Sequence, residues 1–315
     1  MSALDGYRLE WLSSFLAVVD HGGFAAAAEN VYRSQPSISS HVAELEHRLG
    51  AVLFDRKERP VRLTEAGVAF LVHARAVQAE LEAGEAEVQA VLGLLRGRVR
   101  LACYPSAGAA FVPALLREFT TQYPAVEVSL LEGAPVDLGA ALQAGDADLA
   151  IRPLLPVPRE TSVAHDVLWV EPLVAVVAED HPLSRFGSMD LARLSDERLI
   201  TLGSGTQRST EPTEIDHALR DAGLEARVVL RTNEPQTLVA LARGGHGVGV
   251  TNLLAAAVSE TRGTRVIPLH GTTHRREVGV FWDGARAMQP AVRELLDLTL
   301  GMPVPDAVQR YERRA

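Results

Sequence analysis

Residues 34–50 read SQPSISSHVAELEHRLG, and this stretch decides how the N-terminal part of the chain folds. Ser34 is a good helix N-cap, and Pro36 falls in the first turn, where its missing N–H costs no hydrogen bond. Gly50 favours the left-handed backbone that ends a helix. Between them, apolar residues recur at helical spacing: Ile38, Val42, Leu45 and Leu49. We therefore predict a helix whose early turns carry hydroxyl, amide and imidazole groups, with no carboxylate before Glu44.

Two shorter helices are predicted before this stretch. Apolar residues from Leu9 to Val19 recur at intervals of three and four, and Gly22-Gly23 stops the pattern. Phe24 to Tyr32 is rich in alanine, a strong helix former whose small side chain lets helices approach closely. Three helices, the third following a tight turn at Arg33-Ser34, are the physical parts of a helix-turn-helix.

A basic segment follows the third helix. The eight residues from Asp55 to Arg62 carry a net charge of +2 in an acidic chain. Pro60 cannot continue a helix, and Val61 to Leu63 can form a short strand. We expect a small basic hairpin, or wing, whose cations are Arg56, Lys57, Arg59 and Arg62.

These parts predict contact with duplex DNA. Serine, glutamine and histidine side chains can reach base edges in a major groove, and a helix N-terminus can hold a phosphate. The basic wing would lie on the DNA backbone. On periodicity alone, a small helical bundle with a polar, solvated face fits these residues equally well.

Length and composition limit the classes of protein to which the chain can belong. The 315 residues exceed the size at which one hydrophobic core stops growing, so roughly two domains are expected. A net charge of −9 opposes approach to a polyanion, so the local basic segment has to supply the contacts. No apolar run reaches the roughly 18 residues of a membrane span, and Trp11 to Val19 lacks the basic leader of a signal peptide. One cysteine, Cys103, excludes an intrachain disulfide and fits a cytoplasmic location.

A long helix is predicted from Thr64, an expected N-cap, to about Leu95. Within it, small and apolar residues are spaced alternately four and three apart: Phe70, Ala74, Val77, Leu81, Gly84, Val88, Val91 and Leu95. A sustained seven-residue repeat needs a partner helix along its seam, and Gly84 lets two backbones approach closely. We expect a dimerising helix. Packing against its own core is the other interpretation, and the narrowness of the stripe disfavours it.

From Arg98 onward, predicted strands alternate with predicted helices, which is typical of a parallel α/β sheet. The first series has strands over 99–104, 126–131 and 149–151, and helices over 109–123 and 138–144. The second series occupies 168–178, 190–194, 199–202, 213–222, 226–231, 235–242 and 248–251, and a last strand and helix cover 277–282 and 288–300. Two such units with a return of the chain predict a bilobed ligand-binding domain, with a cleft at the carboxyl ends of the strands.

Seven short motifs stand in one order over residues 9 to 67. They are Phe15-Leu16-Ala17-Val18-Val19, Gly22-Gly23-Phe24-Ala25-Ala26-Ala27-Ala28, Ser34-Gln35-Pro36-Ser37-Ile38-Ser39, Leu45-Glu46, Leu49-Gly50, Leu53-Phe54-Asp55-Arg56 and Leu63-Thr64-Glu65-Ala66-Gly67. Each motif is weak, but the ordered set is specific, and it resembles the LysR-type transcriptional regulators. The rest of the chain agrees with that family in length and layout.

The resemblance implies an α/β multidomain protein. It divides into a winged helix-turn-helix over 1–63, a linker helix over 64–96 and an effector-binding domain over 97–315 that is similar to periplasmic binding proteins. Within that domain we expect lobe 1 over about 97–167 and 269–302, and lobe 2 over about 168–268. Such regulators assemble as dimers or tetramers, bind an operator, respond to a small molecule and act on RNA polymerase.

The resemblance also assigns the DNA contacts. In the family, the positions matching Gln35, Pro36, Ser39 and Ser40 approach DNA, and the arginine matching Arg56 contacts its backbone. His41 stands where the family often has glutamine or arginine, so operator preference is expected to differ. The full expected set adds neighbouring polar and basic residues: Ser34, Gln35, Pro36, Ser37, Ser39, Ser40, His41, Arg56, Lys57, Arg59 and Arg62.

The expected effector site lies at strand ends. Ser106 can cap the helix after the first strand, where a hydroxyl and free N–H groups suit a carboxylate, and the family often has serine or threonine there. Arg152 follows a strand where some members use a basic residue against an anionic effector. A surface or interlobe ion pair is the other role for Arg152, and a cap alone the other role for Ser106. The expected contacts are Tyr104, Pro105, Ser106, Arg152, Ser204, Gly205, Thr206, Asn233 and Thr251.

Other chemistry is not predicted. Cys103 lies in an apolar strand, which indicates a buried, inert thiol. His270 and His274 flank a loop-forming stretch, so no metal site and no cofactor are expected. The chain lacks a nucleophile elbow, a phosphate loop and a dinucleotide fingerprint, so it is not expected to be an enzyme. The rival hypothesis is a cytosolic solute-binding protein with an N-terminal assembly module; steep weakening of DNA binding by salt would separate the two.

Overall fold

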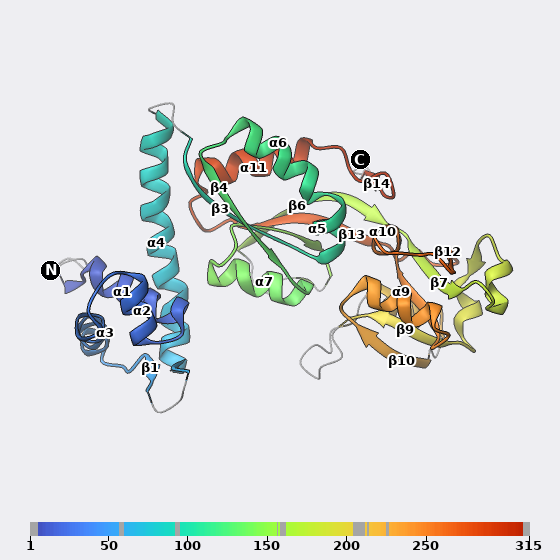
Figure 1. Cartoon of the computed structure of the whole chain (residues 1–315), viewed down its shortest axis with the longest axis horizontal. Helices are drawn as coiled ribbons and strands as arrows, with labels where there is room; N and C mark the ends of the chain where they lie inside the picture. The colour runs from blue at the N-terminus through green and yellow to red at the C-terminus, as the bar shows by residue number, and fades with distance from the viewer. Residues whose placement is uncertain are drawn as a thin grey trace. The chain divides into compact units, whose positions relative to one another are not determined.

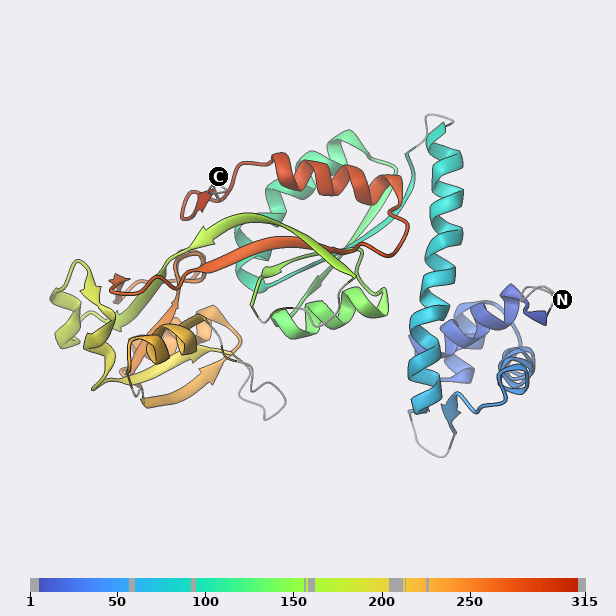
Figure 2. The same ribbon diagram turned by 180° about the vertical axis from the view of Figure 1, so that it is seen from behind.

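The computed structural model describes residues 6–56, 60–91, 95–155, 157, 162–203, 212, 214–224 and 227–310. The chain divides into two compact units, Met1–Glu82 and Ala83–Ala315. Figures 1 and 2 show the ribbon from two sides. Within the described ranges, no helix has the length and apolar character needed to cross a bilayer.

The first unit contains the predicted helices and wing. Its elements are α1 (Leu9–His21), α2 (Phe24–Asn30), α3 (Gln35–Leu49), β1 (Phe54–Asp55), β2 (Arg62–Leu63) and the start of α4 (Glu65–Val91). Gly22 ends α1 and Gly50 ends α3, both with left-handed backbones. Three helices and the wing enclose one core, in which the Phe15 ring lies 5.3 Å from the rings of Phe54 and Phe70.

The N-cap of α4 is Thr64, as predicted. Its Oγ1 accepts a hydrogen bond from the Gly67 N–H at 3.0 Å and donates to the Val52 carbonyl at 2.7 Å, so one hydroxyl ties the helix start to the segment before the wing. Gly67 is required here, because a Cβ at this position would lie 2.1 Å from the Leu53 carbonyl oxygen.

The predicted seam of α4 is divided among three environments. Phe70 and Ala74 pack into the core of the first unit, and Leu95 lies beyond the end of α4 and packs on the core of the second unit. These three positions therefore correct the prediction of one continuous dimer stripe. Between them, exposed members remain: Val77 (44% exposed), Leu81 (48%) and Val88 (60%). A Cβ at Gly84 would meet nothing within 4 Å, so this part of the seam is open.

The second unit contains two mixed six-stranded sheets. The first has the order β14-β6-β13-β5-β3-β4, and the second has the order β10-β9-β11-β7-β12-β8. The strands of the first sheet are β3 (Gly97–Cys103), β4 (Val126–Glu132), β5 (Leu149–Pro153), β6 (Val163–Glu171), β13 (Arg276–Asp283) and β14 (Gln309–Arg310). Those of the second are β7 (Leu173–Ala178), β8 (Met189–Asp190), β9 (Arg198–Leu202), β10 (Arg227–Thr232), β11 (Val248–Asn252) and β12 (Thr264–His270).

Helices cover these sheets. They are α5 (Pro105–Ala110), α6 (Val112–Gln122), α7 (Pro135–Ala144), α8 (Glu214–Asp221), α9 (Pro235–Arg243), α10 (Leu253–Ala257) and α11 (Pro290–Gly301), with 3₁₀ turns η2 (Pro182–Arg185) and η3 (Leu191–Leu194). In both views α6 and α11 lie on one face of the first sheet and α7 lies on the other. We call the first sheet and its helices lobe 1, and the second sheet and its helices lobe 2.

Three predictions about this unit were wrong. The sheets are mixed rather than parallel, because β6 and β7 each pair antiparallel with their neighbours. The single predicted segment 168–178 breaks at Pro172, so lobe 2 begins at Leu173 and its sheet ends at His270. The predicted helix over 109–123 is two helices, α5 and α6, because Pro113 lacks the N–H that a continuous helix would bond to Ala109.

Candidate nucleic-acid interface and interlobe site

The N-terminal end of α3 presents a polar tip. The Ser34 side chain accepts a hydrogen bond from the Ser37 N–H at 3.3 Å, as its N-cap prediction requires. Ile38, Val42 and Leu45 are buried in the core of the first unit. The side chains on the other faces of the first turns are exposed or half-buried: Ser34, Gln35, Pro36 and Ser40 are exposed, and Ser37 and Ser39 are half-buried.

His41 is held inside the first unit. Its Nδ1 lies 2.8 Å from Oγ of Ser14 on α1, and the residue is half-buried. This ring nitrogen is therefore engaged by α1, which leaves the exposed serines and glutamine as the freer hydrogen-bonding groups of the tip.

The wing is pinned by a carboxylate on α3. Glu46 accepts hydrogen bonds from the Leu53 and Phe54 N–H groups at 2.8 and 3.4 Å, and its other oxygen lies 3.0 Å from Nη2 of Arg56. The Arg56 guanidinium also lies 5.0 Å from the centroid of the Phe24 ring, yet half of this side chain is exposed. Glu46 thus fixes both the start of the wing and the direction of its first arginine.

Of the other three predicted wing cations, the structure describes one. Arg62 is exposed on β2, which pairs antiparallel with β1. Lys57 and Arg59 lie outside the described residues. Sequence reasoning missed the role of Glu46, although this residue belongs to one of the quoted motifs; a carboxylate in the half-buried turn of an amphipathic helix was the available signal.

A buried polar cluster lies where strands pass between the lobes. The Tyr104 hydroxyl donates to Oε1 of Glu171, and the Trp169 indole N–H donates to the same oxygen at 3.0 Å. Burial raises the pKa of Glu171, while the charge of Arg276 and the two hydrogen bonds act in the opposite direction. Burial, followed by the charge of Glu171, raises the pKa of Tyr104.

Arg276 joins this cluster to lobe 2. Arg276 begins β13 in lobe 1, and its guanidinium binds both oxygens of Glu214 on α8 of lobe 2 at 3.3 and 3.2 Å. Burial by itself lowers the pKa of Arg276, but the charges of Glu214 and Glu171 outweigh it and raise the pKa. A bidentate arginine–carboxylate pair therefore links the two lobes in a nearly solvent-free setting.

Polar atoms around this pair lack partners among the described residues. They are Oε2 of Glu171, Oγ1 of Thr201, Oγ1 of Thr251 and Nδ2 of Asn252. A cavity of about 10 Å³ adjoins two of these residues, Thr251 and Asn252; its other lining residues are Leu173, Leu202, Glu214, Ile215, Val250 and Arg276. Buried polar groups normally find partners, so these unpartnered atoms make the cluster a candidate site.

Two predicted effector residues, Tyr104 and Thr251, lie at this cluster. Asn233 is exposed at the bend before α9, away from the cluster's contacts. Ser204, Gly205 and Thr206 lie outside the described residues. Glu171, Glu214 and Arg276 were missed; the one signal was Glu171, a charge between two apolar strands.

The cap prediction for Ser106 is wrong, whereas an effector contact of Arg152 stays a prediction. Ser106 does not cap a helix: Tyr104 occupies the N-cap of α5, Pro105 is its first residue, and Ser106 is buried in the first turn. Arg152 is 2% exposed, donates from Nε to the Pro153 carbonyl at 3.0 Å and stacks 5.0 Å from the Phe281 ring centroid. Its charge is therefore held inside lobe 1, since β5 ends by turning this side chain onto β13.

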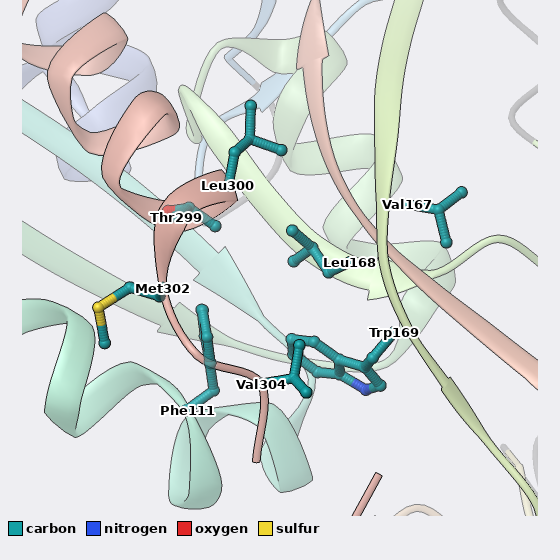
Figure 3. Close-up of a pocket in the computed structure, with 8 residues that line it drawn as sticks. All are labelled: Phe111, Val167, Leu168, Trp169, Thr299, Leu300, Met302 and Val304. Atoms are coloured by element: carbon teal, nitrogen blue, oxygen red, sulfur yellow. The ribbon is translucent and has the colours of Figure 1, made fainter. Parts of the chain in front are cut away.

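A second pocket of about 50 Å³, lined mostly by residues with apolar side chains, lies in lobe 1 between the start of α6, β6 and the end of α11. Figure 3 shows Trp169, Phe111 and Val304 among its lining side chains, with the Thr299 hydroxyl as a polar group. No charged side chain lines it among the described residues, so the interlobe cluster is the better candidate for a polar effector.

Cys103 is buried, and His270 and His274 lie beside different carboxylates. Burial, with the charge of Glu132, raises the pKa of the Cys103 thiol to about 12. His270 lies 3.5 Å from Asp190, and His274 lies 2.7 Å from Asp221, so the two rings have separate carboxylate partners. Among the residues that the structure covers, no cluster of three metal-ligating side chains is found.

A winged helix-turn-helix followed by a long helix and a two-lobed α/β domain defines a class of regulators. Residues 9–68 match the family model described as a bacterial regulatory helix-turn-helix protein of the lysR family, and residues 92–302 match the LysR substrate binding domain. The chain belongs to the LysR family and is a LysR-type DNA-binding transcriptional regulator with an effector-binding domain.

Individual relatives are similar in sequence to this chain over most of their length. The regulator CfxR of Cupriavidus necator is 32% identical over 256 residues, which are 80% of this chain and 78% of that protein. OxyR of Escherichia coli, named a dual transcriptional regulator, is 25% identical over 296 residues, 91% of this chain and 92% of that protein. The regulators named here are not enzymes.

Solved structures show the same fold. A full-length OxyR variant from Pseudomonas aeruginosa gives a TM-score of 0.77 at 23% identity, covering 97% of this chain and 99% of that one. Full-length CbnR in complex with its target DNA gives a TM-score of 0.64 at 25% identity, covering 94% and 99%.

Proposed function

We propose that this regulator binds its operator as a dimer or tetramer through the α3 tips and the wing, and that an anionic effector bound at the interlobe cluster controls that binding. RNA polymerase is the further partner implied for a transcriptional regulator. The effector proposal rests on one observation above all, the buried Arg276–Glu214 pair that joins β13 to α8.

The DNA part is supported by the exposure of the α3 tip. The apolar face of α3 packs into the core of the first unit, whereas Gln35, Pro36 and Ser40 are exposed. Arg56 is half-exposed and aimed by Glu46, which suits a backbone contact beside the recognition helix. Base-edge contacts would give sequence discrimination and the wing would give affinity.

The effector part follows from the electrostatics of Arg276. An arginine this buried has to keep an anionic partner, because an unpaired buried charge costs several kcal/mol, roughly 3–5. A carboxylate of an effector can replace Glu214 while leaving the arginine paired. That exchange would release α8 from β13, and the unpartnered Thr251 and Asn252 groups beside it offer further hydrogen bonds.

Such an exchange gives a ligand unequal affinity for two arrangements of the lobes. A ligand can shift a conformational equilibrium only by its difference in affinity for the two states. The state with the Arg276–Glu214 pair closed excludes the anion, and the state with the pair open accepts it. The proposed signal is therefore the opening or closing of a single ion pair.

The test is a thermal-shift and calorimetric screen of small mono- and dicarboxylates, each beside its neutral amide. We expect a carboxylate to raise the melting temperature while its amide does not. The Glu214→Gln variant should bind that carboxylate about tenfold more tightly, because it removes the competing anion but keeps the side-chain shape.

The Arg276→Gln variant, checked for folding by circular dichroism, should lose the response. Equal shifts from a carboxylate and its amide, or unchanged affinity in the Glu214→Gln variant, would contradict the proposed exchange. Footprinting of DNA upstream of the chain's own gene tests the DNA part separately, because it needs no effector.

A further inference from the structure

Tyr32 adopts a backbone conformation that tyrosine disfavours. It lies in the turn between α2 and α3 with φ 53°, and no other non-glycine residue in the described ranges has a positive φ. The left-handed region places Cβ close to the following carbonyl oxygen, which is why glycine or asparagine normally occupies such a position. Tyrosine at this position therefore costs folding free energy.

Contacts of the Tyr32 side chain within the protein do not offset that cost. Tyr32 is 96% exposed, the most exposed large apolar residue in the described part of the chain. The turn is held by its backbone, since the Val31 N–H donates to the Ala27 carbonyl and the Arg33 N–H donates to the Ala28 carbonyl, both at 3.0 Å. Neither bond involves the phenol ring.

Tyr32 stands beside the proposed DNA-contacting tip. Ser34, the N-cap of α3, is two residues further along the chain, and Arg33 between them is also exposed. The exposed ring of Tyr32 lies near the N-terminal end of α3. There it can pack on a deoxyribose while its O–H donates to a phosphate oxygen. Tyrosine is one of the side chains that proteins use for backbone contacts to DNA.

We infer that Tyr32 is a DNA-contacting residue, which binds the sugar-phosphate backbone at the edge of the groove that α3 enters. This inference rests on the proposed placement of the α3 tip. Backbone contacts carry no sequence information, so the phenol adds affinity equally to every duplex. It also adds no charge, so it contributes nothing to the salt dependence of binding, unlike Arg56.

The experiment measures binding of the full-length chain to two fluorescent duplexes by anisotropy over a range of salt. One duplex contains the site that the wild-type chain protects in footprinting, and the other is a scrambled duplex of equal length. The variants are Tyr32→Phe, which removes only the hydroxyl, and Tyr32→Asn, which removes the ring but accepts the left-handed backbone. Tyr7→Phe, at another exposed tyrosine of the same unit, is the matched control.

We expect Tyr32→Phe to weaken binding to both duplexes by about fivefold, and Tyr32→Asn by about tenfold or more, with the salt slope unchanged. Tyr32→Asn should melt at or above the wild-type temperature, which separates lost contact from lost folding. Tyr7→Phe should bind like the wild type.

Unchanged affinity in both Tyr32 variants would overturn the inference, and loss with asparagine but not phenylalanine would overturn the phosphate hydrogen bond. A loss confined to the specific duplex would contradict backbone contact. A wild-type chain that binds neither duplex would instead refute the proposed function, and the Tyr32 contact with it.

Discussion

Glu171 is a carboxylate with no exposed surface, held by the Tyr104 hydroxyl and the Trp169 indole. Because burial raises its pKa in the folded chain, the folded state keeps the proton at pH values where the unfolded chain has lost it. Its ionisation therefore removes stability as the pH rises from the ordinary glutamate pKa through the raised one. The cluster stays folded because Arg276 offsets part of that cost.

We predict that Glu171→Gln weakens this pH dependence. The free energy of unfolding of the wild type should fall relative to that of the variant as the pH rises above about 4.5. Urea unfolding at several pH values, followed by circular dichroism, measures it. Glu127→Gln, at an exposed carboxylate on β4, is the control and should follow the wild type. If the wild type instead becomes more stable relative to the variant as the pH rises, the folded state favours the ionised form of Glu171.

Cys103 gives a second prediction at this scale. Its pKa of about 12 leaves almost no thiolate at neutral pH, so native alkylation by iodoacetamide should be more than about a hundredfold slower than in denaturant. Mass spectrometry of quenched samples follows the modification. Since the chain has one cysteine, peroxide should also leave DNA binding unchanged. Native labelling at the denatured rate would disprove the inert-thiol interpretation.

Among the elements, α4 combines two roles along one face. Its first turns pack Phe70 and Ala74 into the first unit, and later turns leave Val77, Leu81 and Val88 exposed. An exposed apolar row with an open Gly84 is the part of the heptad that needs a partner. The repeat in the sequence could not reveal where its own core ends and the partner begins, because both use the same spacing.

We predict that Leu81→Asp weakens dimerisation by at least about tenfold, since a charge in a helix seam loses its hydration. Val72→Asp is the matched control: Val72 is 44% exposed, and nine residues are about two and a half helical turns, so it lies on the opposite face of α4. Sedimentation equilibrium measures both. Equal behaviour of the two variants would place the dimer contact elsewhere.

Local signals explain which elements could be predicted. Caps at Ser34 and Thr64 and the Pro60 wing depend on neighbours in sequence, and all appear as expected. The break between α5 and α6 and the break at Pro172 also have local causes, but continuous apolar runs concealed them. At both places a proline interrupts an otherwise continuous apolar run.

At the scale of the molecule, the sequence predicted the class of protein but only part of the proposed effector site. Tyr104 and Thr251 were predicted from strand ends, whereas the Arg276–Glu214 pair joins residues 62 apart in different lobes. No spacing rule relates such residues, because their meeting depends on two sheets being built first. The contact between Arg152 and Phe281 is also a tertiary one, so the sequence alone could not reveal it.

Direct readout by α3 is the central claim, and discrimination between duplexes tests it most directly. Anisotropy titrations with the protected site and a scrambled duplex should show Gln35→Ala reducing the ratio of the two affinities by about tenfold, from loss of a base contact. Arg56→Ala should weaken both equally and lower the salt slope by about one. A Gln35→Ala protein with the wild-type ratio, or an Arg56→Ala protein with the wild-type slope, would contradict this account of the interface.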